Sequence, residues 1–190
     1  MMDAKLMEEI FSTEQGMNSL PSFSLDVSEE TRSNIEKILN HMSRISPIEA
    51  DMVELHMLKG VSQALLGKIF GYTQPNVHYR ISRGVERLKV YMQISIYTEE
   101  DLRARLAGLF TNEKDIEVMV LLYMYSSQSH VARLLGDTQG KVRYRYLKCL
   151  ESLERAPNMQ DVYISMKVLG ENLTLLRIDP EDYAQKRVFL

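Results

Sequence analysis

The sequence predicts a mainly α-helical protein built from two tandem copies of one small domain. The stretch GYTQPNVHYRISRGVERL begins at Gly71, and a similar stretch, GDTQGKVRYRYLKCLESL, begins at Gly136. From residue 62 onward, ten of 27 positions are identical to the position 65 residues later. Apolar residues in both copies recur at steps of three and four, as on one face of a helix. A period of 65 residues is too long for one unit of a helical solenoid, so it indicates two domains.

The composition is that of an ordinary globular protein. Of 190 residues, 45% are apolar and 26% are charged, and the net charge is −3. No apolar run is long enough for a transmembrane helix. The opening residues, MMDAKLMEEIFSTEQG, carry acids where a signal peptide carries basic residues. We therefore expect a cytoplasmic protein without a membrane partner.

Nothing in the sequence predicts an enzyme. A single cysteine, Cys149, cannot form an intramolecular disulfide or a CxxC metal pair. The four histidines stand apart from one another and have no neighbouring ligands at helical spacing. We expect no catalytic residues, no bound metal and no cofactor.

The predicted elements begin with a mobile N-terminal segment, residues 1–28, which lacks clear periodicity. The first domain, residues 29–92, opens on an amphipathic helix in SEETRSNIEKILNHMSRI. Its inward residues are expected to be Ile35, Ile38, Leu39 and Met42. In the next helix, SPIEADMVELHML, we expect Ser46 as N-cap, Pro47 at the first helical position and Glu49 completing a capping box. Its predicted inner face is Ile48, Met52, Leu55 and Leu58.

Two further helices complete the first domain. One begins near Ser62 and ends at Gly71, where glycine can adopt the positive φ of a tight turn. Thr73 is expected to cap the next helix. The buried face of that helix is predicted to be Val77, Ile81, Val85 and Leu88. A short helix, a glycine turn and a capped helix form a helix-turn-helix.

The second domain, residues 93–156, repeats this order. A helical connector is expected to start at Thr98, with Leu102, Leu106 and Leu109 inward. The next helix opens at Thr111, with Ile116, Met119, Val120 and Tyr123 inward, and the following one begins near Ser127 and ends at Gly136. Thr138 is expected to cap a last helix with Val142, Tyr146, Leu150 and Leu153 inward.

The tail, residues 157–190, is predicted to contain a small β-hairpin. DVYISMKVLGENLTLLRI is rich in β-forming residues around a Gly-Glu-Asn turn. An exposed two-stranded ribbon usually pairs with something, so the tail is a candidate homodimer contact.

The outward residues of the two helix-turn-helix units point to DNA. Glutamine and asparagine can bond an adenine edge, and arginine and lysine suit guanine or phosphate. Arg87 is also expected on the outward face. The predicted DNA-binding residues are Ser62, Gln63, Lys68, Thr73, Gln74, Asn76, His78, Tyr79, Arg80 and Arg83 in the first unit, and Ser127, Gln128, Arg133, Thr138, Gln139, Lys141, Arg143, Tyr144, Arg145 and Lys148 in the second. Tyr79 and Tyr144 could instead be packing residues.

Positive charge is concentrated on these two units. Residues 62–89 hold five basic residues and one acid, and residues 127–154 hold five and three. Residues 1–60 hold eleven acids and five basic residues. An acidic chain with two basic helix-turn-helix units is typical of a protein that binds a duplex locally.

The first unit, VSQALLGKIFGYTQPNVHYRISRGVERLK, resembles region 4 of bacterial sigma factors. Six residues occupy the positions of that family's pattern: Val77, Arg80, Ile81, Arg83, Gly84 and Leu88. The second unit fits less closely, with Val142, Arg145, Tyr146, Lys148, Cys149 and Leu153. The resemblance covers about half of the chain. It implies major-groove reading of a −35 promoter element, contact with RNA polymerase, and a bacterial, phage or mobile-element origin with residence at the nucleoid.

The chain also departs from that family. It has no recognisable promoter-melting region and no tryptophan, so a self-sufficient sigma factor is not expected. The leading hypothesis is a sequence-specific double-stranded DNA-binding transcription regulator. The alternatives are a sigma-mimicking factor that binds RNA polymerase mainly by protein contact, and a DNA-packaging or replication adaptor. One copy could bind DNA while the other docks a protein.

Overall fold

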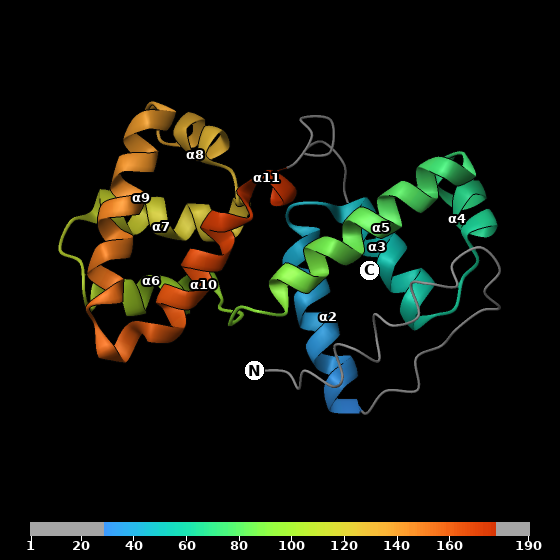
Figure 1. Cartoon of the computed structure of the whole chain (residues 1–190), viewed down its shortest axis with the longest axis horizontal. Helices are drawn as coiled ribbons and strands as arrows, with labels where there is room; N and C mark the ends of the chain where they lie inside the picture. Colours follow the sequence, from blue (N-terminus) through green and yellow to red (C-terminus); the bar gives the residue numbers. More distant parts are fainter. Residues whose placement is uncertain (1–28, 178–190) are drawn as a thin grey trace. The chain divides into compact units, whose positions relative to one another are not determined.

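The computed structural model describes residues 29–177, and these residues form helices and no strand (Figure 1). The predicted mainly α class is therefore confirmed. The described residues divide into two compact units with the boundary after Met92. Unit 1 comprises residues 29–92 and unit 2 comprises residues 93–177 of this described part. The N-terminal segment 1–28 and the end of the tail, 178–190, lie outside the described residues.

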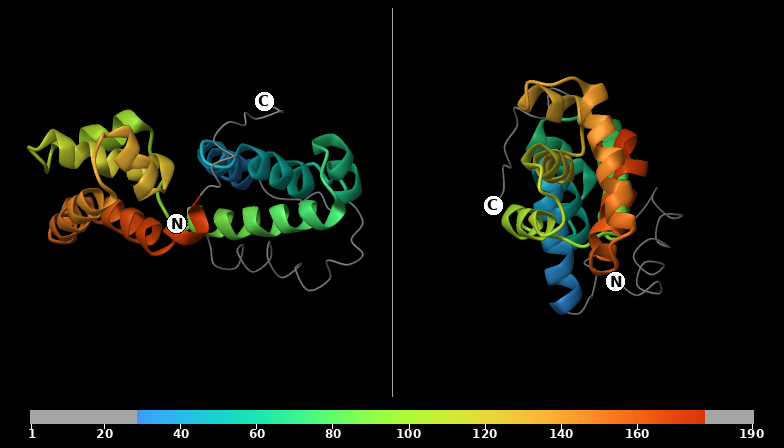
Figure 2. Two further views of the ribbon diagram at one scale, coloured as in Figure 1. Left: turned by 90° about the horizontal axis from the view of Figure 1, so that it is seen from above. Right: turned by 90° about the vertical axis from the view of Figure 1, so that its left-hand side faces the viewer.

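Unit 1 is built from helices that pack on one long helix. Its elements are α2 (Glu29–Ser43), α3 (Pro47–Val53), the π-helical turn η2 (Glu54–Leu58), α4 (Gln63–Phe70) and α5 (Gln74–Tyr91). α3 packs along α5, α2 lies against both, and α4 packs on α5 (Figure 2). The predicted inward residues of α2 and α5 are all buried: Ile35, Ile38, Leu39, Met42, Val77, Ile81, Val85 and Leu88.

The inner face of α3 differs from the prediction. Met52 and Leu58 are buried, but Ile48 and Leu55 are only half-buried. Because α3 contacts both α2 and α5, its buried surface is wide and takes in two acids, Glu49 and Asp51. The π-helical turn that follows α3 shifts the helical register, which turns Leu55 away from the core.

Unit 2 repeats this helix order and adds to it. Its elements are α6 (Glu99–Ala107), α7 (Glu113–Tyr125), α8 (Gln128–Leu134), α9 (Gln139–Glu154), the 3₁₀ turn η3 (Pro157–Met159), α10 (Gln160–Glu171) and α11 (Leu173–Leu176). At the sequence offset of 65 residues, α6, α7, α8 and α9 align with α2, α3–η2, α4 and α5. α7 packs on α6, α8 and α9, and α10 packs on α9.

The turns agree with the predictions in part. Gly71 and Gly136 both adopt positive φ, 71° and 60°, as the turn between the paired helices requires. Thr98 and Thr138 accept the expected cap hydrogen bonds, from the backbone N–H groups of Asp101 and Lys141.

Two predicted helix starts differ in detail. Thr73 occupies the N-cap position of α5, as expected, but its hydroxyl makes no cap bond. Pro75, at the second helical position, has no N–H to donate. Asn112, not Thr111, caps α7, because its side-chain oxygen accepts from the N–H of Lys114 at 3.0 Å.

Other predicted inner positions need correction too. Leu109 is 37% exposed because α6 ends at Ala107 and the backbone turns there. Leu150 is only half-buried because its neighbour Cys149 occupies the core position on α9. The remaining predicted inward residues of unit 2 are buried: Leu102, Leu106, Ile116, Met119, Val120, Tyr123, Val142, Tyr146 and Leu153.

The predicted β-hairpin in the tail is wrong. Residues of DVYISMKVLGE lie within α10. Val162, Met166 and Leu169 are buried at steps of four and three, a helical spacing that faces α9. Packing against α9 therefore overrides the β propensity of the segment. The homodimer contact was expected because of an exposed two-stranded ribbon, and this segment forms a helix instead.

The docking of α10 on α9 depends on Gly170. The hydroxyl of Tyr146 donates to the backbone oxygen of Met166 at 2.8 Å, and burial raises the pKa of Tyr146 to about 12. A Cβ atom at position 170 would overlap the Tyr146 hydroxyl. Separately, no helix within residues 29–177 has the length and apolar character needed to cross a membrane.

We predict that Gly170→Ala destabilises unit 2 by about 1–3 kcal/mol, because the added methyl group displaces the Tyr146 ring from α10. Gly140→Ala is the matched control. Gly140 is also helical, but a Cβ there meets nothing within 4 Å, so the change should stabilise by up to about 1 kcal/mol. Urea unfolding measures both. Equal stabilisation by the two substitutions would contradict close packing of Tyr146 on Gly170.

Candidate nucleic-acid interface

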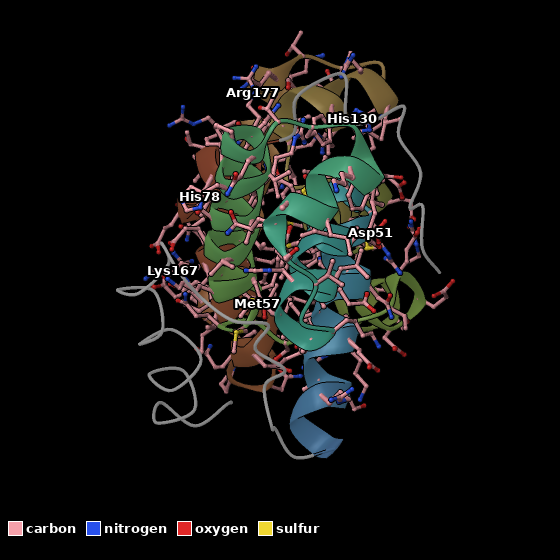
Figure 3. All side chains as sticks on the ribbon, turned by 90° about the vertical axis from the view of Figure 1, so that its right-hand side faces the viewer. Asp51, Met57, His78, His130, Lys167 and Arg177 are labelled. Atoms are coloured by element: carbon pink, nitrogen blue, oxygen red, sulfur yellow. The ribbon has the colours of Figure 1, made fainter. Side chains whose placement is uncertain are left out.

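The predicted DNA-binding residues of unit 1 lie on α4, the following turn and the first half of α5. Tyr79 is 59% exposed, so it is not a packing residue within unit 1. Ser62 accepts from the N–H of Leu65 at 3.3 Å and so caps α4. Gln63, Arg80 and Arg83 are half-buried. The exposed members of the set are Ser62, Lys68, Thr73, Gln74, Asn76, His78 and Tyr79, and His78 projects outward from α5 (Figure 3).

In unit 2 the corresponding residues lie on α8 and α9. Tyr144 is 69% exposed, like its counterpart Tyr79. Ser127 is buried, and its hydroxyl caps α8 by accepting from the N–H of His130. Gln128 and Arg145 are half-buried. The exposed members are Arg133, Thr138, Gln139, Lys141, Arg143, Tyr144 and Lys148.

The basic residues of α5 are held inside unit 1. The Arg80 guanidinium lies 4.7 Å from the centre of the Tyr72 ring, a cation–π contact. Arg87, predicted to face outward, is 1% exposed and donates to Glu49 Oε2 at 2.6 Å and to Ser46 Oγ. The prediction failed because the helix period places Arg87 opposite a buried carboxylate that needs a counter-charge.

Glu49 is therefore not part of a capping box. Ser46 is the N-cap residue of α3, but its hydroxyl makes no cap bond and accepts from Arg87 instead. Glu49 is 1% exposed, and Arg83 lies 4.0 Å from its second oxygen. We call Glu49, Arg83, Arg87 and Ser46 the Glu49 clamp. It ties α3 to α5.

Unit 2 has an equivalent contact made by different residues. Asp115, at the start of α7, is 3% exposed and accepts from Arg145 and, at 3.5 Å, from Lys148. We call these three residues the Asp115 clamp. Asp115 aligns with Ala50, one position after Glu49, and its partner Arg145 aligns with Arg80. In both units an acid within an apolar helix face thus joins equivalent helices, α3 to α5 and α7 to α9. An acid in an apolar face is a sequence signal that could have revealed both clamps.

The exposed face of α9 remains basic. Lys141 and Lys148 have side chains that are 69% and 59% exposed, and Arg143 is also exposed. Lys141 pairs with Asp137 at 3.0 Å, and its hydrogen bond lowers the pKa of that carboxyl. Exposed pairs of this kind are weak, so Lys141 can exchange this partner for another anion at little cost.

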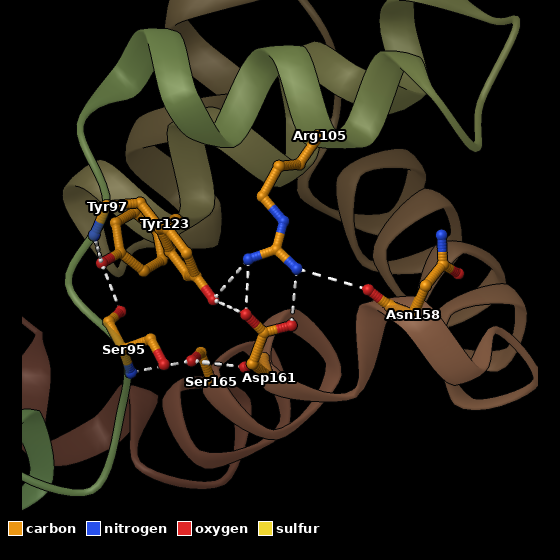
Figure 4. A network of polar contacts seen from close by, with 7 residues as sticks. All are labelled: Ser95, Tyr97, Arg105, Tyr123, Asn158, Asp161 and Ser165. Carbon is orange, nitrogen blue, oxygen red and sulfur yellow. Dashed lines mark hydrogen bonds and ion pairs between the residues drawn. The ribbon is translucent and has the colours of Figure 1, made fainter. Parts of the chain in front are cut away.

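A polar network at the start of unit 2 was not predicted (Figure 4). Arg105 donates to both oxygens of Asp161, one of them at 2.7 Å, and Tyr97 donates to Asp161 at 2.7 Å. Hydrogen bonding from Arg105 lowers the pKa of Asp161 to about 2, and burial raises the pKa of Tyr97. Its role is to join α6 to α10.

The same network fixes the backbone that precedes α6. Tyr123 accepts from the N–H of Tyr97 at 3.0 Å and donates to the carbonyl oxygen of Ser95 at 2.9 Å. Ser165 accepts from the N–H of Ser95 at 3.1 Å and donates to the carbonyl oxygen of Asp161. These bonds connect residues 95–97 to both α7 and α10. The network supports the fold of unit 2 and lies apart from α8 and the first half of α9.

In the part of the chain that is described, no three His, Cys, Asp or Glu side chains gather as metal ligands. Cys149 is 1% exposed, and burial raises the pKa of its thiol to about 12. The thiol is therefore protonated at neutral pH and a poor nucleophile.

No protein-family model matches the chain, and searches of curated proteins and of solved structures returned no match. The sequence pattern and the geometry of the two units are therefore the basis for a functional proposal.

We predict that Glu49→Gln destabilises unit 1 by about 3–5 kcal/mol, because Arg87 keeps its charge in a buried position and loses the Glu49 carboxylate. The double variant Glu49→Gln/Arg87→Met removes both charges and should recover most of that loss. Urea unfolding of the single and double variants gives the coupling. A loss below about 1 kcal/mol for Glu49→Gln, as for an exposed pair, would contradict the buried clamp.

We also predict a pH-dependent contribution from Asp161. Its folded-state pKa of about 2 lies below the usual value near 3.9, so the charged carboxylate stabilises unit 2 above pH 4. That contribution is lost as the pH falls through 2. Asp161→Asn should lower the melting temperature at pH 7, and the difference from wild type should shrink between pH 4 and pH 2. Glu151→Gln, on the exposed face of α9, is the control and should show no such convergence.

Proposed function

We propose that the chain is a sequence-specific double-stranded DNA-binding protein that acts in transcription. α4–α5 and α8–α9 would serve as two helix-turn-helix units. The observation that carries the proposal is the shared exposed face on the first half of α5 and α9. Both faces present a glutamine, a tyrosine and polar or basic residues directly after a glycine turn.

The position of these residues matches how such units bind. In helix-turn-helix proteins the second helix enters the major groove and its N-terminal residues meet the base edges. Gln74 and Gln139 are the first residues of α5 and α9, and both are exposed. Asn76 and Lys141 follow at equivalent positions, also exposed. Glutamine and asparagine would read adenine, and lysine would contact guanine or phosphate.

The resemblance to sigma region 4 supports a role in transcription, because it includes Arg80, Arg83 and Gly84 in unit 1. The structure changes what two of those arginines can do. Arg80 stacks on Tyr72, and Arg83 belongs to the Glu49 clamp, so in unit 1 they support the recognition helix from within. In unit 2, Arg145 has the equivalent supporting role through Asp115.

A second candidate function is a sigma-mimicking factor that binds RNA polymerase by protein contact. One observation favours it. Leu65 and Ile69, one turn apart on α4, are 49% and 42% exposed. An exposed apolar pair on one helix face is more typical of a protein contact than of a phosphate contact. Capture of purified RNA polymerase without DNA, lost in Leu65→Ser/Ile69→Ser, would favour this candidate.

The test of the main proposal is selection from a pool of random duplexes at low salt. We expect one sequence class to be enriched, and we predict that Arg143→Gln weakens binding to it. If Arg143 reads a base, the loss is about 1–3 kcal/mol and specificity relaxes at one position. If it contacts a phosphate, the loss is uniform across sequences and the salt slope falls by about 1.

The control is Arg155→Gln at the other end of the same helix. Arg155 is exposed and lies about 18 Å along α9 from Arg143, beyond the proposed groove. It should leave binding unchanged. Absence of any enriched sequence would refute the proposal, and equal losses from the two arginine variants would refute the placement of α9.

A further inference from the structure

The two units differ in how many positive charges they present to solvent. Their repeated stretches hold equal numbers of basic residues, five each. Among residues 62–83, however, Lys68 is the one exposed cation, and Arg80 and Arg83 are half-buried. Among residues 127–148, the exposed cations are Arg133, Lys141, Arg143 and Lys148. The inequality therefore arises from folding and not from composition.

The contacts within unit 1 explain why its arginines are withdrawn. Arg87 is 1% exposed and paired with Glu49, which is equally buried. Moving such a guanidinium to a phosphate would take the nearest positive charge away from a buried carboxylate, which is strongly unfavourable. Arg83 shares the same carboxylate, and Arg80 stacks on Tyr72. The arginines of α5 are thus held by contacts within unit 1.

Unit 2 pairs its buried carboxylate with fewer of its basic residues. Asp115 is satisfied mainly by Arg145, whose side chain is 26% exposed. Lys148 lies further from Asp115, at 3.5 Å, and its side chain is 59% exposed. Lys141 and Arg143 lie outside the clamp. Three cations of α9 therefore remain on the solvent face.

The outward residues of α5 have a complementary character. Gln74 and Asn76 are exposed, and their amide side chains carry no charge. Uncharged amides contribute little to counterion release, which grows with the number of phosphates neutralised. They can, however, bond adenine edges in pairs, which is a source of sequence selectivity.

We propose that the two units divide the work of binding DNA: α8 and α9 of unit 2 bind the phosphate backbone and supply most of the affinity, while Gln74 and Asn76 of unit 1 read base edges and supply most of the selectivity. This inference rests on the proposed function. It predicts that salt dependence and sequence discrimination can be removed separately, by substitutions in different units.

The experiment uses the full chain and two duplexes of equal length, the sequence enriched from the random pool and a scrambled version. Affinity for each is measured over a range of salt concentrations. Lys141→Gln/Arg143→Gln should reduce the slope of log affinity against log salt by about 1.8, because each phosphate contact contributes about 0.9. It should weaken binding to both duplexes by the same factor.

Gln74→Ala/Asn76→Ala should leave that slope unchanged and reduce the preference for the enriched duplex by about 10- to 100-fold. All four residues are exposed, so circular dichroism should show native helix content in both variants. Lys68→Gln, the matched charge change on unit 1, should reduce the slope by no more than about 0.9.

The outcomes separate this inference from the proposed function. Failure to enrich any duplex overturns the proposed function and this inference with it. Equal effects of the two double variants on slope and on preference overturn the division of work and leave DNA binding intact. Loss of both properties in Lys141→Gln/Arg143→Gln alone also overturns the division. In that case unit 1, with Leu65 and Ile69 exposed, would be a protein contact.

Discussion

A carboxylate buried between two helices governs each unit of this protein. In unit 1 it is Glu49, which binds Arg87 and Ser46 and lies near Arg83. In unit 2 it is Asp115, which binds Arg145 and Lys148. Burying an unpaired charge is so costly that each acid fixes the rotation of the following basic helix about its axis. That rotation decides which side chains face solvent, and therefore which of them can reach a ligand.

The two copies have diverged both at this contact and on their outward faces. The exposed glutamine and tyrosine are the same in both, but Asn76 and His78 are replaced by Lys141 and Arg143. At the contact, the acid has moved by one position and its main partner by nearly two turns. The helix crossing differs as well. A Cβ at Gly84 would collide with Val53, so α5 approaches α3 closely, whereas the aligned residue of α9 is Cys149. The second crossing must leave room for a thiol.

Local pattern in the sequence was sufficient for most of the helices. The inward residues of α2, α5 and α7, the glycine turns, and the caps at Thr98 and Thr138 follow from periodicity and from hydrogen bonds between neighbours in the chain. The sequence alone could not show contacts between residues that are far apart in the chain. Arg87 and Glu49 are 38 residues apart, and Tyr146 meets Met166 over 20 residues. Those pairings reversed the expectations for Arg87, for the capping box and for the tail, whose β-forming residues became helical on contact with α9.

The buried thiol of Cys149 allows opening of the unit 2 core to be measured by thiol labelling. It is the one cysteine in the sequence, and it lies in the core of unit 2 with a pKa near 12. A thiol reagent can therefore reach it only in molecules whose α7–α9 core has separated. The rate of labelling then counts those opening events directly, without a fluorescent tag or an engineered residue.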